Sequence, residues 1–288
     1  MKTIHLVDTT LNDQNQTSGA TFSLKEKVMI ARMLDFLGVE IIEAGVPSRN
    51  EKELAAVSVI NSLGLRARIT TWNSLNIGDI RASLNCGVRD IHVSAPVSDM
   101  LIRCKTGGAG QWILDNTKRV MRYAGEYGCR ISVGAEDASR AEWVLLEEFA
   151  LLAQEMGAER FRFVDSMGIM EPMEVLEKLS CLREKLSIDI EFQGHNNTDT
   201  AVTNAVVAVK AGVRYITTSV KGRSRWAAGT DLKKLVLALK ISGFSPNLRF
   251  NMINKLERYV TTSVGEQRQQ NVSTDLISQK NRFLKGDS

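Results

Sequence analysis

The sequence contains no long apolar run. No stretch approaches the roughly 20 consecutive apolar residues that a helix needs to cross a bilayer. The opening MKTIHLVDTT becomes polar after only a few apolar residues, which is not the pattern of a secretory signal peptide. We therefore expect a cytoplasmic protein that does not interact with membranes.

Cysteines are few and scattered. The chain has four, at positions 86, 104, 129 and 181, and no two of them form a CxxC pair. Closely spaced, paired cysteines are the usual sign of a disulfide framework in a secreted protein. We therefore expect reduced thiols, in keeping with a cytoplasmic location.

An excess of charge of one sign is also missing. The 37 basic and 33 acidic residues leave a formal net charge of only +4, and no long basic run is present. The composition therefore does not indicate nucleic-acid binding. With 288 residues, of which 43% are hydrophobic and 24% charged, the chain is long enough for a large core and for one or two domains.

One local pattern recurs along the chain. A helical stretch ends in Gly, and a short run rich in β-branched and aromatic residues follows. Glycine suits the left-handed position just beyond a helix end, and short apolar runs are typical of strands buried on both faces. The copies lie at 37–45, 63–72, 86–95, 127–136, 156–165 and 211–220, and two further strands are predicted at 2–8 and 187–194.

Helical patterns fill the intervals between these runs. The stretch SLKEKVMIARMLDFLG at 23–38, for example, starts with a Ser and repeats its apolar residues at helical spacing. Eight strands, each followed by a helix, predict a parallel sheet. The length fits a closed (β/α)₈ TIM barrel over residues 1–245, followed by a helical or loose C-terminal extension over 246–288. An open, doubly wound sheet is the alternative.

A barrel of this kind places its site at the C-terminal ends of the strands. Polar residues follow almost every predicted strand, and their convergence at one mouth argues for a ligand site. The fold alone does not name the reaction. These residues are Asp8, Asp13, Glu43, Trp72, Asn73, Ser94, Glu136, Asp165, Ser166, Gln193, His195, Thr218 and Lys221.

Several motifs, in the same order along the chain, resemble those of the homocitrate and isopropylmalate synthase family. They are VDTTLNDQNQTSGATFSLKEKVMIA (7–31), IEAGVP (42–47), GAEDASRA (134–141), FVDSMGIMEP (163–172) and GHNNTDTAVTNAVVAVKAGVRYITTSVKG (194–222). The resemblance covers residues 3 to 241 and is strongest to the homocitrate synthases of nitrogen-fixing bacteria. It implies a TIM barrel with a divalent metal at the mouth. It also implies condensation of an acyl-CoA with a 2-oxo acid, the metal acting as Lewis acid.

Compared residue by residue, the metal site that the resemblance implies is altered. Asp13 stands at the position of the first ligand, but Asn12 replaces the neighbouring arginine. The H-x-H pair becomes Gln193 and His195, and Gly229 replaces an asparagine. Two strong ligands, Asp13 and His195, fall short of the three protein ligands that catalytic zinc sites usually have. We therefore expect a metal site that is lost or weakened, with no resident cofactor. A divalent metal is the alternative.

Other positions keep the family's residues. By resemblance, Glu43 and Glu136 are candidates for a general base or for an orienting carboxylate, with Asp13 and His195 as further candidate catalytic groups. The alternative for the two glutamates is a structural role as buried, paired carboxylates, and for the other two a hydrogen-bonded pair. The candidate substrate-binding residues are Gln16, Ser94, Arg140, Ser166, Gln193, Asn197, Lys221, Arg223 and Arg225.

The basic residues after the last predicted strand are the second feature of interest. Lys221, Arg223 and Arg225 could form an anion pocket that replaces the positive charge of a metal, because arginine binds carboxylates through two parallel hydrogen bonds. The alternative is a basic loop in contact with solvent. On the first hypothesis, a di- or tricarboxylate binds between the last two strands and the first.

Two functions are consistent with these residues. The first is a diverged enzyme, an acyltransferase or a carbon–carbon lyase, acting on a small 2-oxo or hydroxy polycarboxylate with an acyl-CoA as co-substrate. The second is a catalytically silent barrel that binds such an acid or supports a partner synthase subunit. The lyases of hydroxymethylglutaryl-CoA are shorter relatives with the same barrel. The expected partners are a small carboxylate and a second copy of this chain or a synthase subunit.

Overall fold

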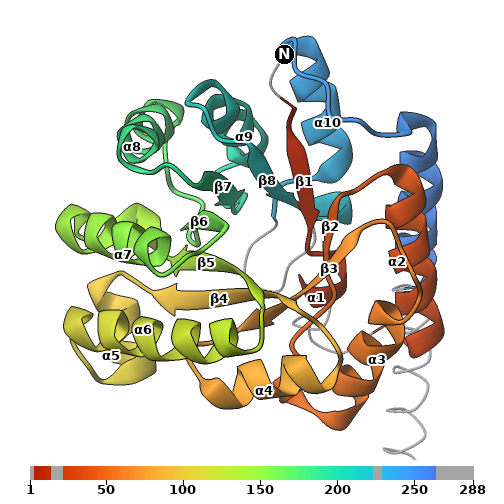
Figure 1. Ribbon diagram of the computed structural model, residues 1–288. Helices are drawn as coiled ribbons and strands as arrows, with labels where there is room; N and C mark the ends of the chain where they lie inside the picture. Colours follow the sequence, from red (N-terminus) through yellow and green to blue (C-terminus); the bar gives the residue numbers. More distant parts are fainter. Residues whose placement is uncertain (1–2, 14–21, 223–228, 264–288) are drawn as a thin grey trace, which may run out of the picture.

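The computed structural model describes residues 3–13, 22–222 and 229–263. Eight parallel strands form a closed barrel in chain order (Figure 1), as the glycine pattern predicts. The fold is therefore a (β/α)₈ TIM barrel. The strands are β1 (His5–Asp8), β2 (Ile41–Glu43), β3 (Arg68–Asn73), β4 (Asp90–Pro96), β5 (Arg130–Glu136), β6 (Arg160–Asp165), β7 (Asp189–Gly194) and β8 (Tyr215–Thr218).

The seam between the first and last strands closes the sheet. β1 pairs with β8 in parallel over the whole of both strands, from His5 opposite Tyr215 to Asp8 opposite Thr218. β7 pairs with β8 in the same direction, with Glu191 opposite Tyr215. This closure rules out the open, doubly wound sheet.

Helices surround the barrel (Figure 1) and cover its outer surface. Two of them, α5 and α6, lie between β4 and β5, and short 3₁₀ segments follow β2, β5 and β8. The α-helices are α1 (Thr10–Asp13), α2 (Leu24–Leu37), α3 (Glu51–Asn61), α4 (Ile77–Asn85), α5 (Asp99–Thr106), α6 (Gly110–Glu126), α7 (Trp143–Glu155), α8 (Pro172–Lys185), α9 (Ala201–Lys210) and α10 (Leu232–Ile241). The 3₁₀ segments are η2 (Pro47–Arg49), η3 (Ala138–Arg140), η4 (Val220–Gly222) and η5 (Phe250–Met252).

Local sequence signals explain where the helices begin and end. Ser23 accepts a hydrogen bond from the backbone N–H of Glu26, and the Glu26 side chain accepts one from the backbone of Ser23, so α2 begins with a capping box. The six glycines that were predicted to follow helices all have positive φ, which a residue with a Cβ adopts only under strain. They are Gly38, Gly64, Gly87, Gly128, Gly157 and Gly212.

The described part of the C-terminal extension packs against the barrel. It comprises η5 and a helix over residues 253–263. Ile253, Leu256 and Val260 are buried in the same hydrophobic cluster as the barrel helices. The Arg249 guanidinium lies 4.4 Å from the centre of the Phe36 ring in α2. The domain boundary at residue 245 stays a prediction, and residues 264–288 lie outside the described residues.

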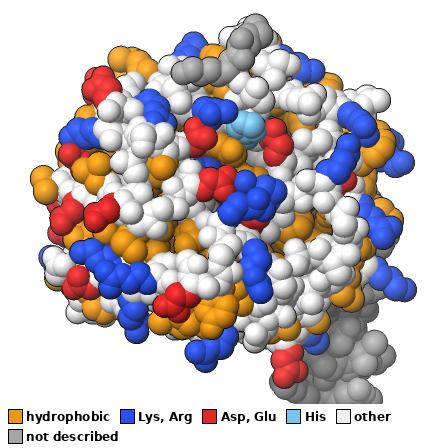
Figure 2. Space-filling model, in the orientation of Figure 1, with side chains coloured by type: hydrophobic (Ala, Val, Ile, Leu, Met, Phe, Trp, Pro, Cys, Tyr) orange, Lys and Arg blue, Asp and Glu red, His pale blue; other side chains and the backbone are white. Residues whose placement is uncertain are grey.

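Charge is distributed evenly over the visible surface. On the face drawn in Figure 2, basic and acidic side chains are intermingled and do not gather in one basic area, consistent with a net charge of +4. Within the described ranges, no helix combines the length and the apolar character that a membrane span requires.

Candidate functional site

The barrel interior is polar and charged where β6 and β7 face it. Successive side chains of a strand point to opposite faces. On β6, Phe161 and Phe163 are completely buried in the hydrophobic layer that includes the helices, whereas Arg160 and Arg162 face the inside of the barrel. β7 alternates in the same way, with Glu191 facing inwards. TIM-barrel interiors are usually filled by branched aliphatic side chains, so this charged interior is a specific feature of the chain.

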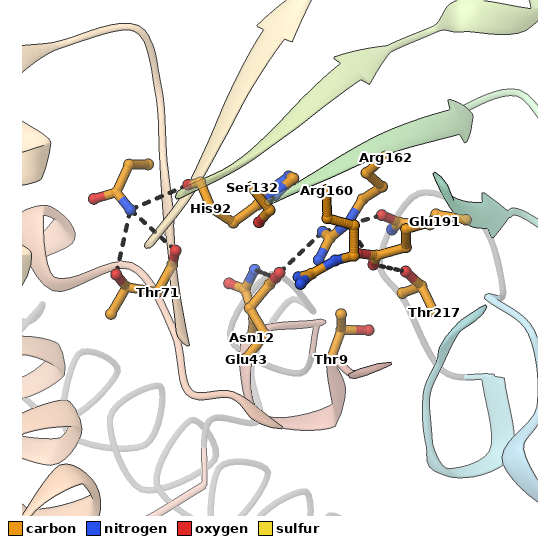
Figure 3. A network of polar contacts seen from close by, with 12 residues as sticks. Thr9, Asn12, Glu43, Thr71, His92, Ser132, Arg160, Arg162, Glu191 and Thr217 are labelled. Carbon is orange, nitrogen blue, oxygen red and sulfur yellow. Dashed lines mark hydrogen bonds and ion pairs between the residues drawn. The ribbon is translucent and has the colours of Figure 1, made fainter. Parts of the chain in front are cut away.

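A continuous series of contacts runs from the mouth into the interior (Figure 3). Asn12 Nδ2 of α1 donates to Glu43 Oε1 at 2.7 Å. Arg162 Nη1 donates to the other oxygen of Glu43 at 3.0 Å and lies 3.4 Å from Gln193 Oε1. Residues from four elements of the barrel, α1, β2, β6 and β7, therefore form one unit, which we call the mouth network: Asn12, Glu43, Arg162 and Gln193.

Beneath the mouth network, a second layer fixes the arginines. Glu191 Oε1 lies 2.6 Å from Arg162 Nε, and Glu191 Oε2 lies 2.5 Å from Arg160 Nε. The Thr217 hydroxyl donates to Glu191 Oε1 at 2.5 Å. Arg160 also lies over the Tyr215 ring, 4.8 Å from its centre. Glu191 is thus a shared partner that holds both guanidinium groups in place.

The electrostatics of these pairs favour full ionisation. Burial alone would raise the pKa of Glu191, but the guanidinium groups of Arg162 and Arg160 outweigh it, and the pKa lies below its ordinary value. Burial alone would lower the pKa of Arg162, but Glu191 and Glu43 outweigh it, and this pKa is raised. An ion pair removed from water needs such close partners to compensate for its lost hydration. The two layers therefore combine two cations with two anions.

His92 lies against this charged group and is neutral. Burial, followed by the charges of Arg162 and Arg160, holds the pKa of His92 well below its ordinary value of 6.5. Its Nδ1 lies 2.9 Å from the Ser132 hydroxyl. Its Nε2 has no hydrogen-bond partner among the described residues and packs against Gly134, where an added Cβ would come within 2.6 Å. His92 is therefore part of the packed interior.

Asp8, at the end of β1, is a buried carboxyl group with a strongly shifted pKa. Burial raises its pKa from 3.8 to about 7. A hydrogen bond from Thr10 opposes this rise, and the negative charge of Glu43 adds to it. Its Oδ1 accepts from the Thr10 backbone N–H at 2.9 Å, whereas Oδ2 has no hydrogen-bond partner within the described ranges. Asp8 thus holds a proton near neutral pH.

The segment QGHNNTD at 193–199 is attached to the end of β6 by hydrogen bonds. The His195 Nδ1 atom lies 3.0 Å from the carbonyl oxygen of Asp165. Asn197 Nδ2 donates to the Met167 carbonyl at 2.7 Å. The Thr198 hydroxyl donates to the carbonyl of Gly168 at 2.8 Å. These neutral contacts form a rim on one side of the mouth.

His195 is the titratable group of this rim. Burial lowers the pKa of His195 below 6.5, although the Asp165 carbonyl and carboxylate oppose the effect. A carbonyl oxygen only accepts, so Nδ1 carries the hydrogen and Nε2 carries the lone pair. His195 can therefore accept a proton, or bind a cation, through Nε2.

Glu136 and Arg140 both have partners of their own. Glu136 forms an ion pair with Lys105 of α5. Arg140 binds the buried Asp137 carboxylate, with Nη2 at 2.6 Å from Oδ2 and Nε at 2.9 Å from Oδ1. The Ser166 hydroxyl accepts from the Asp137 backbone N–H at 2.9 Å. Glu136 and Arg140 are thus each paired with a neighbouring charge, and their roles toward a ligand stay predictions.

The remaining predicted residues are dispersed. Ser94 is buried in β4. Lys221 is exposed in η4 with a left-handed φ of 62°. Asp13 is the last residue of α1, and its assignment as metal ligand with His195 stays a prediction. Gln16, Arg223 and Arg225 lie outside the described residues.

Sequence reasoning did not identify the arginines and the glutamate that form the centre of the network. The signal was present in the alternation R-F-R-F at 160–163 and in D-I-E-F-Q at 189–193. Strict alternation of polar and apolar residues marks a strand with two unlike faces. On a strand of a closed barrel, the polar face must point inwards, because helices cover the other face.

The described residues do not fit a divalent metal. They contain no group of three His, Cys, Asp or Glu side chains placed to hold an ion. Both oxygens of Glu43 are bound, by Asn12 and Arg162. Gln193 directs its oxygen at a guanidinium group, which would also repel a cation.

A closed TIM barrel with its polar groups gathered at the strand ends defines the class of this protein. Within that class, the chain belongs to the HMGL-like family, whose pattern matches residues 3–260.

The relatives are synthases. 2-Isopropylmalate synthase 2 of Caldanaerobacter subterraneus subsp. tengcongensis is 38% identical over 83% of this chain and 62% of its own length. Homocitrate synthase subunit alpha of Clostridium pasteurianum is 38% identical over 82% of this chain and 88% of its own. Homocitrate synthase 1 of Nostoc sp. is 37% identical over 92% of this chain and 71% of its own. The chain thus matches less than two thirds of the first of these relatives.

Two solved structures of similar fold are HMG-CoA lyases. An HMG-CoA lyase of Bacillus subtilis superimposes with a TM-score of 0.83 at 14% identity, over 92% of this chain and 95% of that one. An HMG-CoA lyase of Acinetobacter baumannii, solved with coenzyme A and 3-methylmalate, gives 0.82 at 12% identity, over 91% and 92%. At these identities the likeness concerns the fold alone.

Proposed function

We propose that this barrel binds a small 2-oxo or hydroxy polycarboxylate at its mouth and forms or breaks a carbon–carbon bond in it, with an acyl-CoA as co-substrate. The observation that carries the proposal is the mouth network, in which a cation, a carboxylate and two amides are in contact inside an HMGL-like barrel. The synthase names of the relatives support the substrate class.

The chemistry that these residues can perform is proton transfer and charge stabilisation. His195 is neutral near pH 7, because its pKa lies below 6.5, so it is in the form that accepts a proton. Asn12 and Gln193 are amides that can both donate and accept hydrogen bonds. A divalent metal would supply Lewis-acid activation of a carbonyl group, but the donor set described above does not fit one, and we assign no step to it.

Calorimetry and a turnover assay on the purified chain test this function. We expect 2-oxoglutarate to bind. In a panel of 2-oxo acids, we expect thiol release from acetyl-CoA with an acid other than 2-oxoglutarate or 2-oxoisovalerate. Oxaloacetate, 2-oxoisovalerate and pyruvate complete the panel. If none of these acids binds, the proposed function fails.

A catalytically silent subunit is the second candidate. The relative from Clostridium pasteurianum, 88% of which is matched, is named as subunit alpha of a homocitrate synthase, so a barrel of similar extent belongs to an assembly there. On this hypothesis the chain binds the acid and does not release thiol on its own. Binding without turnover, together with a mass in solution equal to one chain, would favour this candidate.

A further inference from the structure

We propose that Arg162 is the cation that binds a carboxylate of the ligand, and that this binding needs no divalent metal. The inference rests on the proposed function, because it names the group that recognises the ligand at the same mouth. It starts from the mismatch between the described donor set and a metal ion.

The first argument is the unfilled hydrogen-bonding capacity of Arg162. Its Nη1 contacts Glu43 and Gln193, and its Nε lies beside Glu191. Its Nη2 is buried and has no hydrogen-bond partner among the described residues. A buried donor without a partner is destabilising, so an oxygen atom supplied by a ligand would stabilise the site. Arginine presents Nη1 and Nη2 as a planar pair that matches the two oxygens of a carboxylate.

The second argument is the strength of the contacts around this guanidinium. Gln193 Oε1 lies 3.4 Å from Nη1, beyond the usual range of about 2.7–3.2 Å for a hydrogen bond of this type. It is the weakest of the contacts and the one that a ligand oxygen can displace. Gln193 is also the partner that lies at the strand end, and it is partly exposed. Access to Arg162 therefore leads past Gln193.

The third argument concerns the neutral residues beside it. The resemblance places an arginine at position 12 and a histidine at position 193, where this chain has Asn12 and Gln193. Asn12 donates to Glu43 without adding a charge, so Arg162 supplies the positive charge on that carboxylate. A carboxylate-binding role for Arg162 is consistent with the replacement of the arginine at position 12 by Asn12.

Arg160 provides a matched control. It is as deeply buried as Arg162, with 2% of its side chain exposed in each case, and it pairs with the same Glu191. It lies one layer deeper, over Tyr215, and is not part of the mouth network. Loss of either arginine should destabilise the barrel, but only the loss of Arg162 should abolish recognition of a carboxylate.

The experiment is calorimetry with 2-oxoglutarate on the full chain, first in excess EDTA and then with added Mg²⁺, Mn²⁺ or Zn²⁺. We expect the same affinity under all of these conditions. Arg162→Met should lower the affinity tenfold or more, and Arg160→Met should change it by less than about threefold. Arg162→Lys keeps the charge but not the planar pair, and should give an intermediate loss. This variant also serves if Arg162→Met does not fold, which circular dichroism would show.

The outcomes separate the inference from the proposed function. Binding that disappears in EDTA and returns with a metal would overturn the inference and leave the proposed function standing. The same holds if the Arg162 variants bind as well as the wild type does. If no acid of the panel binds to the wild type, both proposals fail.

Discussion

Glu43 is the residue through which the site is best understood. As a free carboxylate it would be a general base or a metal ligand, but each of its oxygens has a short contact, to Asn12 and to Arg162. To accept a proton from a ligand, it would have to use an oxygen that already accepts a hydrogen bond from one of these partners. The interpretation as a paired, orienting carboxylate is therefore favoured over that of a base, and His195 becomes the stronger candidate for proton transfer.

The raised pKa of Asp8 makes stability depend on pH. Asp8 binds its proton more tightly in the folded state, with a pKa of about 7 against an ordinary 3.8. Between these values the folded state holds more protons than the unfolded state, so stability falls as pH rises. The slope from this group is at most about 1.4 kcal/mol per pH unit.

Asp8→Asn should remove that slope, because an amide does not titrate and still accepts from the Thr10 N–H. We expect the variant to be more stable than the wild type at pH 8, and the difference to vanish as pH falls toward 4. Urea unfolding across this range measures it. Asp115→Asn, on the exposed face of α6, is the control. If the free energy of unfolding depended on pH in the same way for Asp8→Asn and the wild type, the raised pKa of Asp8 would be contradicted.

At the scale of elements, the rim formed by residues 193–199 depends on the turn after β6. Gly168 has a φ of +59°, and a Cβ there would lie 2.4 Å from the carbonyl oxygen of His195. Gly128 has a similar φ of +66°, but nothing lies within 4 Å of its Cβ position. Both glycines thus have a left-handed backbone, but only at Gly168 would a Cβ clash with a neighbouring segment.

Gly168→Ala should therefore cost more stability than Gly128→Ala. Both substitutions add the strain of a left-handed residue, about 1–2 kcal/mol. The first also forces the rim and the β6 turn apart, for which an additional cost of about 1–3 kcal/mol is typical. Chemical unfolding of both variants gives the comparison. Equal losses would mean that the rim can move away without cost.

The elements could be predicted from the sequence much better than the site. The glycine after six of the helical stretches and the short apolar runs predicted the strands and their order, because those signals are local. The mouth network joins residues 12, 43, 162 and 193, and such contacts depend on how the barrel closes. Arg162 directly precedes the motif FVDSMGIMEP at 163–172, in which the resemblance points to Asp165 and Ser166. Resemblance directs attention to positions already known to matter, and Arg162 was not among them.

For the whole molecule, the first expectation is a low metal content. Elemental analysis by mass spectrometry should find well under one divalent ion per purified chain. The double variant Asn12→Arg and Gln193→His should bind Zn²⁺ or Mn²⁺ more tightly, because it adds a nitrogen ligand beside His195. Asn197→His adds a histidine to the exposed part of the same rim and is the control. Tightly bound zinc, manganese or iron in the unmodified protein would show this expectation to be wrong.

The second expectation at this scale concerns turnover. We expect no appreciable homocitrate or isopropylmalate synthesis by this chain on its own. Loss of one charge-stabilising group at an oxyanion site costs about 10²–10³-fold, and by resemblance both an arginine and a metal ligand are replaced. Thiol release from acetyl-CoA with 2-oxoglutarate or 2-oxoisovalerate is the measurement. A rate of about 1 s⁻¹ or more, typical of ordinary enzymes, would refute it.

The charged interior also has a consequence for how the chain folds. A shift of β6 by one residue against its neighbours would exchange its two faces. Arg160 and Arg162 would then lie among apolar helices without Glu191, and two phenylalanines would occupy the inside of the barrel. An aliphatic interior would tolerate such a shift far better, since its two faces resemble each other. The same charged side chains thus favour one strand pairing during folding and, on the proposed function, form the ligand site, so both requirements constrain the same residues.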